Sequence, residues 1–129
     1  MHVRACLLVA ALLGGAVRAY GGDASHISPD ELLAEIQRAD PPLIIDVRSQ
    51  GEYDAGHVPG AKHIPFYAIL TQRSEISPTR PLVVYCAHGP RAGIAKLQLW
   101  TAGFDHVRYL EGHMSAWKAR GFPVETAAP

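Results

Sequence analysis

The sequence has few cysteines and no clusters of like charge, and both features limit what the protein can be. It contains two Cys among 129 residues, and its 12 Lys and Arg residues balance its 12 Asp and Glu residues. No basic run of five or more residues is present, so the sequence lacks the charge pattern typical of non-specific binding to nucleic acid or to an anionic membrane. We therefore expect small-molecule or protein partners and no nucleic acid.

Long apolar runs are also scarce, and the longest lies at the N-terminus. Arg4 precedes an apolar run of thirteen residues at 5–17, which is shorter than the roughly 20 residues of a membrane span. This arrangement is typical of a secretory signal peptide. We expect a signal peptide over residues 1–19, cleaved after Ala19 or a few residues later, and a periplasmic or secreted protein without stable membrane insertion. An uncleaved anchor and a buried N-terminal helix are the alternatives.

Residues 20–129 have the size and composition of a single folded domain. The whole chain is 48% hydrophobic, and its 12 Gly and 10 Pro are neither periodic nor clustered, which excludes disordered and collagen-like chains. Cleavage of the signal peptide would remove Cys6 and leave Cys86 as the only cysteine. A disulfide needs two cysteines, so Cys86 is either an inert core residue or a reactive thiol.

Strand and helix patterns alternate along this domain. Short β-branched runs predict strands at 43–47, 62–64, 82–85 and 107–110, and capping and periodicity signals predict helical segments at 28–39, 49–52, 66–70, 91–102 and 114–120. This alternation is typical of an α/β fold with a central parallel sheet and helices on both faces. In the helix at 91–102, Ile94, Leu97 and Trp100 share one face, with Ala95 and Leu99 beside them. We expect this face to pack on the core together with Phe104 and Trp117.

The segment after the predicted strand at 82–85 has the residues of an anion-binding loop. In parallel sheets, ligands bind where strand ends give way to helix starts, and Cys86 stands there. Free backbone N–H groups and the positive end of the following helix favour a thiolate. Gly89 allows close backbone approach, Pro90 stiffens the turn, and Arg91 adds a cation with a bidentate donor fork. The loop therefore combines a nucleophile with an anion cradle.

The loop Cys86-Ala87-His88-Gly89-Pro90-Arg91 resembles the active-site loop of the rhodanese (sulfurtransferase) family. Two further stretches are similar to that family's N-terminal and C-terminal signatures. They are Asp46-Val47-Arg48 with Glu52-Tyr53 and Gly56-His57-Val58-Pro59-Gly60-Ala61, and Leu110-Glu111-Gly112 with Ala116-Trp117. The resemblance extends over about residues 27–124. His113 departs from it, because Gly is commoner there, and we expect the departure to affect turn geometry more than chemistry.

This resemblance implies a rhodanese-like fold of the single-domain secreted type. It implies transfer of sulfane sulfur from thiosulfate or a related donor to a thiophilic acceptor, through a persulfide on Cys86. The small-molecule donor would be bound by the rest of the loop, namely Ala87, His88, Gly89, Pro90 and Arg91. His88 would contact the donor or face water, and Arg91 would orient the anion. No cofactor is implied.

The remaining polar residues have structural interpretations. Asp46 and Arg48 follow a predicted strand and are expected to form a supporting pair that ties the loops near the site. His57 lies in a Gly-flanked turn and is expected to form hydrogen bonds there. The spacing of the other histidines, His26, His63, His106 and His113, does not match a metal site, so we expect no metal.

Two other classes of function are considered beside sulfur transfer. A cysteine-dependent phosphatase or arsenate reductase also uses a thiolate and an Arg, but places five residues between them, whereas four separate Cys86 from Arg91. A rhodanese-like binding or persulfide-carrier module without turnover commonly lacks the cysteine. The presence of Cys86, Gly89 and Arg91 favours an enzyme. The sequence predicts no particular oligomeric state.

Overall fold

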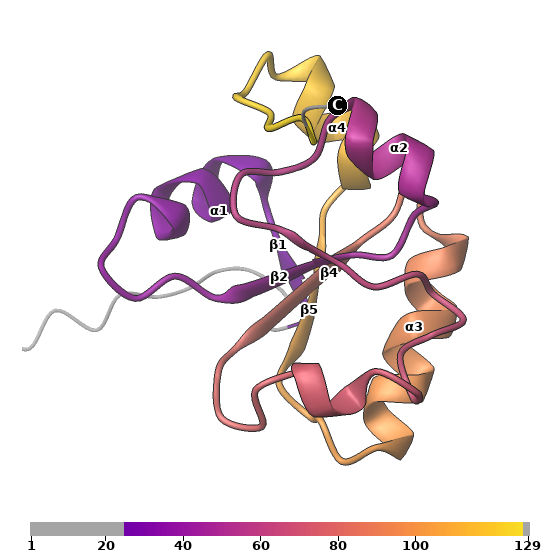
Figure 1. Ribbon diagram of the computed structural model, residues 1–129. Helices are drawn as coiled ribbons and strands as arrows, with labels where there is room; N and C mark the ends of the chain where they lie inside the picture. The colour runs from indigo at the N-terminus through magenta and orange to yellow at the C-terminus, as the bar shows by residue number, and fades with distance from the viewer. Residues whose placement is uncertain (1–24, 128–129) are drawn as a thin grey trace, which may run out of the picture.

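The computed structural model describes residues 25–127 and contains a five-stranded sheet in which all neighbouring strands are parallel (Figure 1). The strands are β1 (His26–Ile27), β2 (Leu43–Asp46), β3 (Lys62–His63), β4 (Leu82–Tyr85) and β5 (Val107–Leu110), in the order β1-β5-β4-β2-β3. The predicted parallel α/β architecture is confirmed. The predicted signal peptide at 1–19 lies outside the described residues. Within 25–127, no helix is long and apolar enough to cross a membrane.

Capping residues determine where the first two helices begin. The helices are α1 (Pro29–Ile36), α2 (Gln50–Ala55), α3 (Pro90–Thr101) and α4 (His113–Ala119), with a 3₁₀ turn η1 at Arg73–Glu75. Ser28 and Glu31 form a capping box at the start of α1, and Ser49 and Glu52 form another at the start of α2. Each box satisfies backbone N–H groups that have no partner inside the helix.

Successive side chains of the central strands point to opposite faces of the sheet, which divides the core into two layers. In β4, Leu82 and Val84 pack with the inner face of α3, whereas Val83 and Tyr85 pack with α1 and α4. Successive side chains of a strand point to opposite faces of the sheet, so a strand that is apolar at every position requires cover on both sides. Figure 1 shows α3 on one side of the sheet, and α1 and α4 on the other.

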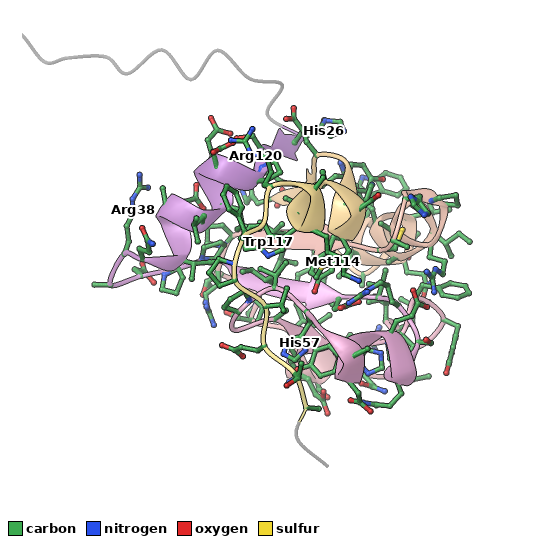
Figure 2. The ribbon with its side chains drawn as sticks, turned by 90° about the horizontal axis from the view of Figure 1, so that it is seen from above. His26, Arg38, His57, Met114, Trp117 and Arg120 are labelled. Atoms are coloured by element: carbon green, nitrogen blue, oxygen red, sulfur yellow. The ribbon has the colours of Figure 1, made fainter. Side chains whose placement is uncertain are left out.

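Helix α4 and the segment after it close one layer of the core. Figure 2 shows Met114 and Trp117 on the side of α4 that faces the sheet, and both side chains are buried. Trp117 packs edge-to-face on Phe122, with ring centroids 5.2 Å apart, and donates its indole N–H to the carbonyl of Pro123. The predicted core role of Trp117 is confirmed.

Three predicted helical segments differ from the structure. The short turn expected at 49–52 is a helix of six residues, α2, that continues to Ala55. Helix α1 ends at Ile36 instead of Ala39. The N–H of Arg38 donates to the carbonyl of Glu35, three residues back, so the chain tightens into a turn and leaves the α-helical pattern there. The predicted helix at 66–70 is a series of turns. Its first amide, that of Phe66, donates to the carbonyl of Val47, so contact with the end of β2 holds this segment in a non-helical path. Strand β1 was not predicted from sequence.

The prediction of which face of α3 packs on the core is wrong. Ile94, Leu97 and Trp100 were expected in the core, but they are 49%, 61% and 68% exposed. The buried face carries Ala92, Ala95 and Leu99 instead. The small side chains of Ala92 and Ala95 allow α3 to pack close to the sheet through this face. The second apolar face of the helix is then left facing away from the core.

Candidate active site

The loop after β4 wraps its backbone around the thiol of Cys86. Tyr85 ends the strand and Pro90 begins α3, so the connecting segment is only Cys86 to Gly89. The backbone N–H of Gly89 donates to Cys86 Sγ across 2.9 Å. Gly89 has φ +140°, a conformation that side chains other than glycine rarely adopt. Glycine at this position therefore lets the loop turn its amide onto the sulfur.

Helix α4 holds the same loop from outside. The backbone N–H of Met114 donates to the carbonyl of Cys86 at 3.0 Å, and that of Ser115 donates to the carbonyl of Ala87 at 3.3 Å. The first N–H groups of a helix have no partner inside it. Here the loop carbonyls are those partners, so the starts of α3 and α4 fix the loop between them.

Hydrogen bonds to the Cys86 thiol change its pKa more than burial does, and in the opposite direction. Cys86 is 1% exposed, and burial by itself raises the pKa of a thiol. Hydrogen bonds from the His113 side chain and from the backbone at Ala92, Gly89 and His88 act in the opposite direction and lower the pKa of Cys86 from 9.0 to about 6. The thiolate is therefore the main form at neutral pH.

A buried network fixes the end of β4 next to the nucleophile. Asp46 and Arg48 form an ion pair, with 2.7 Å between Nη2 and Oδ2. The Arg48 guanidinium also donates to the carbonyl of Gly56, while the hydroxyl of Tyr85 donates to Asp46 and accepts from the N–H of Val58. These bonds join the ends of β2 and β4 to the turn at 56–58. Tyr85 immediately precedes Cys86, so the network also positions the thiol.

The donor fork of Arg91 is occupied by Glu52. Nη1 and Nη2 of Arg91 lie 2.7 and 3.0 Å from the two carboxylate oxygens of Glu52. This bidentate bond lowers the pKa of Glu52 to about 2, so the carboxylate stays charged and paired. The sequence predicts that Arg91 orients an anionic donor, and this role stays a prediction. In the structure the guanidinium is paired with Glu52 beside the loop and joins α3 to α2.

A depression of about 300 Å³ lies beside the loop. Its lining includes Ala87 and His88 of the loop, Glu52 of α2, and Ser115 and Lys118 of α4. The His88 side chain is exposed and lines this depression. Pro90 begins α3 and is exposed.

His57 is buried in a hydrogen-bonded turn. Its ring stacks on Tyr53 with 3.7 Å between centroids, and its Nδ1 lies 2.8 Å from the Tyr53 carbonyl. Its backbone pairs with that of Glu125 in both directions, and Figure 2 shows the C-terminal segment running to His57. The contacts are those of a structural turn residue. Within residues 25–127, no three His, Cys, Asp or Glu side chains form a group that could hold a metal.

Sequence reasoning missed three residues that shape this site. Glu52 was noted for its capping pattern, and Tyr85 for its place in a strand; their partners Arg91 and Asp46 lie 39 residues away, which no local pattern reveals. His113 was expected to affect turn geometry more than chemistry. Its departure from the commoner glycine was the available signal. A side chain at this position of the signature has to fit against the neighbouring active-site loop.

The fold and site define an α/β domain that presents a low-pKa thiol in a backbone cradle at the carboxyl ends of parallel strands. The profile of the rhodanese-like domain matches residues 28–120, and the chain belongs to the rhodanese family. A sulfurtransferase from Allochromatium vinosum is 30% identical over 78% of this chain and 94% of the relative. The thiosulfate sulfurtransferase GlpE from Pseudomonas entomophila is 32% identical over 79% and 91%.

Solved structures agree with this assignment. The crystal structure of the Alr3790 protein from Anabaena sp. is similar with a TM-score of 0.73 and 32% identity, covering 78% of this chain and 82% of that chain. The curated relatives and the matched profile together support a role in the sulfurtransferase family.

Proposed function

We propose that this protein is an enzyme that moves sulfane sulfur from thiosulfate or a related donor to a thiophilic acceptor through a persulfide on Cys86. In the first half-reaction, the Cys86 thiolate attacks the outer sulfur of thiosulfate. A new S–S bond forms on Cys86, the bond to the sulfonate sulfur breaks, and the electron pair leaves with sulfite. In the second, an acceptor such as cyanide or a thiolate takes the outer sulfur, and the Cys86 thiolate is regenerated.

The observation that carries this proposal is the pairing of a low thiol pKa with a backbone donor on the sulfur. With a pKa of about 6, the Cys86 nucleophile is ionised at neutral pH without a separate general base. The Gly89 N–H at 2.9 Å is already aimed at Sγ, where charge develops when the persulfide discharges. Neither half-reaction needs a proton, a metal or an organic cofactor.

Burial of the thiol favours donors with a slender terminal atom. Because Cys86 is 1% exposed, a donor has to enter the loop with its reacting atom foremost. The terminal sulfur of thiosulfate can do this, whereas the phosphorus of a phosphate ester is shielded by its oxygens. His88 and Lys118 line the depression beside the loop, and their polar or positive groups suit an anionic donor.

Intact mass spectrometry tests the proposal directly. Purified mature protein incubated with thiosulfate should gain the mass of one sulfur atom, release one sulfite per gain, and lose the added mass on treatment with cyanide. Cys86→Ser should do none of these. A Cys86→Ser protein that gains sulfur or releases sulfite at the native rate would show that the nucleophile is another group.

The same preparation separates the other two classes of function. Hydrolysis of an aryl phosphate that depends on Cys86 and exceeds sulfur transfer would favour a phosphatase. Loading with a single sulfur that no small acceptor removes would favour a persulfide carrier. Repeated sulfite release at excess thiosulfate and cyanide is the result expected of an enzyme.

A further inference from the structure

His113 lies where the chain conformation itself calls for glycine. It is the only residue other than glycine with positive φ among the described residues, at +55°. That conformation is unfavourable for a residue with a Cβ. A side chain kept at such a position suggests that its contacts offset the backbone cost.

The contacts of His113 all involve the active-site loop or the strand next to it. Its Nδ1 accepts the backbone N–H of Cys86 at 3.1 Å. Its Nε2 lies 3.4 Å from the point that a Cβ on Gly89 would occupy. The ring also contacts the ring of Tyr109 on β5, with 6.1 Å between centroids. The imidazole is thus packed against the loop on the side of α4.

These contacts determine which nitrogen carries the proton. Nδ1 accepts a hydrogen bond from the Cys86 N–H, so it holds no proton, and in the neutral ring the proton is on Nε2. The same side of the ring that carries Nε2 adjoins Gly89, whose own N–H is bonded to Cys86 Sγ. The Nε2–H therefore lies on the side of the ring that faces Gly89, the residue whose backbone contacts the sulfur.

We propose that His113 is a positioning residue for Cys86, which holds the nucleophile through its backbone N–H and turns an Nε2–H donor toward its sulfur. This inference rests on the proposed sulfur transfer for its role in turnover, but its effect on the free thiol does not. The donor stabilises the thiolate before loading. It stabilises the same sulfur again when the acceptor removes the outer sulfur and Cys86 Sγ becomes the leaving group.

Other charged groups around Cys86 are paired or peripheral. Arg91 of α3 is held by Glu52 of α2, Asp46 and Arg48 at the end of β2 form their own pair, and His88 is exposed on the loop. Hydrogen bonding by the His113 side chain is the largest of the effects that lower the pKa of Cys86. A change at His113 should therefore be visible in the titration of the thiol.

The test is the pH dependence of Cys86 alkylation by iodoacetamide in the mature protein. His113→Gly should raise the midpoint from near pH 6 by about one unit, with about tenfold slower alkylation at pH 5. Because glycine is favoured at φ +55°, this variant should fold, with an unfolding midpoint in urea no lower than the native one. His106→Ala, whose side chain is 88% exposed, is the matched control and should leave the midpoint unchanged.

Asn tests which part of the ring matters. Asn adopts positive φ more readily than most residues, and its amide oxygen can accept the Cys86 N–H, but it is too short to replace Nε2. His113→Asn should restore the midpoint at most in part. An unchanged midpoint in His113→Gly would overturn the proposal, and a fully native midpoint in His113→Asn would overturn the role of Nε2.

The rates of the two half-reactions are a second, independent test of the role of His113. At pH 8.5 the thiol is ionised in both proteins, so loading by thiosulfate should be at least as fast in His113→Gly, while discharge to cyanide should be several-fold slower because the leaving thiolate is more basic. Equal slowing of both steps would overturn the leaving-group role. If no donor loads the native protein, the proposed function fails, and the alkylation midpoints still decide the effect of His113 on the thiol.

Discussion

Tyr85 and Cys86 are adjacent in the chain and both are buried, yet their acidities change in opposite directions. Burial and the neighbouring carboxylate of Asp46 raise the pKa of Tyr85 far above its ordinary value, because a phenolate would be poorly solvated and repelled by the carboxylate that accepts the phenol's hydrogen bond. Cys86 is surrounded by hydrogen-bond donors instead, and its pKa falls to about 6. Burial by itself therefore predicts neither value, and the sign depends on whether the nearest groups donate or accept.

Neutralising Glu52 should increase the attraction of the site for anions. Glu52→Gln leaves Arg91 unpaired beside the loop, and Gln still serves in a capping box, so α2 should remain intact. We expect the KM for thiosulfate to fall several-fold at low salt, and the gain to shrink as salt is added. Steady-state kinetics at two ionic strengths measure this. Glu75→Gln, which removes the exposed pair with Lys62, is the control, and an equal fall there would contradict the prediction.

Gly112 should tolerate a side chain less well than Gly121, although both have φ +67°. A Cβ on Gly112 would overlap with that of Ala116, whereas nothing lies near one on Gly121. Gly121→Ala should cost about 1 kcal/mol of unfolding free energy for its backbone conformation. Gly112→Ala should cost roughly 2–4 kcal/mol, because overpacking is added.

Urea unfolding monitored by tryptophan fluorescence measures both free energies. Ala116→Gly combined with Gly112→Ala should recover part of the larger loss, since it removes the overlapping atom. Equal losses in the two single variants would show that backbone conformation alone requires Gly112.

At the scale of elements, the site depends on where two helices begin. The N-terminus of α3 supplies the amides that face Cys86 Sγ, and the N-terminus of α4 supplies the amides that hold the loop carbonyls. Neither helix begins with a side-chain cap. The loop replaces that cap at α4, so the stability of α4 and the shape of the active site depend on each other.

The corrected face of α3 gives a direct comparison of two leucines on one helix. Leu99 is 0% exposed and packs in the core, while Leu97 is 61% exposed. Leu99→Ala should lower the unfolding free energy by about 2–5 kcal/mol, since it leaves a cavity. Leu97→Ala should change it by no more than about 0.5 kcal/mol. Chemical denaturation of the two variants decides this, and a similar loss in both would mean that the outer face is covered.

At the scale of the whole molecule, strand order places the site in the centre of the sheet. Strand β4 is the middle strand, with β5 on one side and β2 on the other. The chain leaves β2 toward β3 and leaves β4 toward β5, so the connections diverge between these two strands. Ligand sites in open parallel sheets lie at such a divergence, and here it brings together Cys86, Asp46 and Arg48.

Export remains a prediction about the whole chain. Protein taken from its native host should begin near Tyr20, lack Cys6 and contain one titratable thiol, because the basic residue and short apolar run at the start are typical of a cleaved signal. N-terminal sequencing and thiol titration measure this. A mature chain that begins at Met1 or His2 would contradict the prediction.

Local patterns were sufficient for much of this protein. Helix starts and buried strands follow from interactions between near neighbours. The signals are the capping boxes at Ser28 and Ser49, the apolar residues of β2 before Asp46, and the uniformly apolar run of β4. The place of Cys86 between a strand and a helix similarly follows from alternation along the chain. These features require only that backbone N–H groups find nearby partners and that apolar strands be covered.

Tertiary structure decided the rest, because the remaining choices depend on contacts between distant residues. Packing of Ala92 and Ala95 on the sheet left Trp100 outside, although its spacing suited the core equally well. The Arg91 fork met Glu52 only after α2 and α3 came together. The ring of His113 accepts a hydrogen bond from the backbone N–H of Cys86, which lies 27 residues away in the sequence. This long-range contact connects the first residue of α4 to the nucleophile.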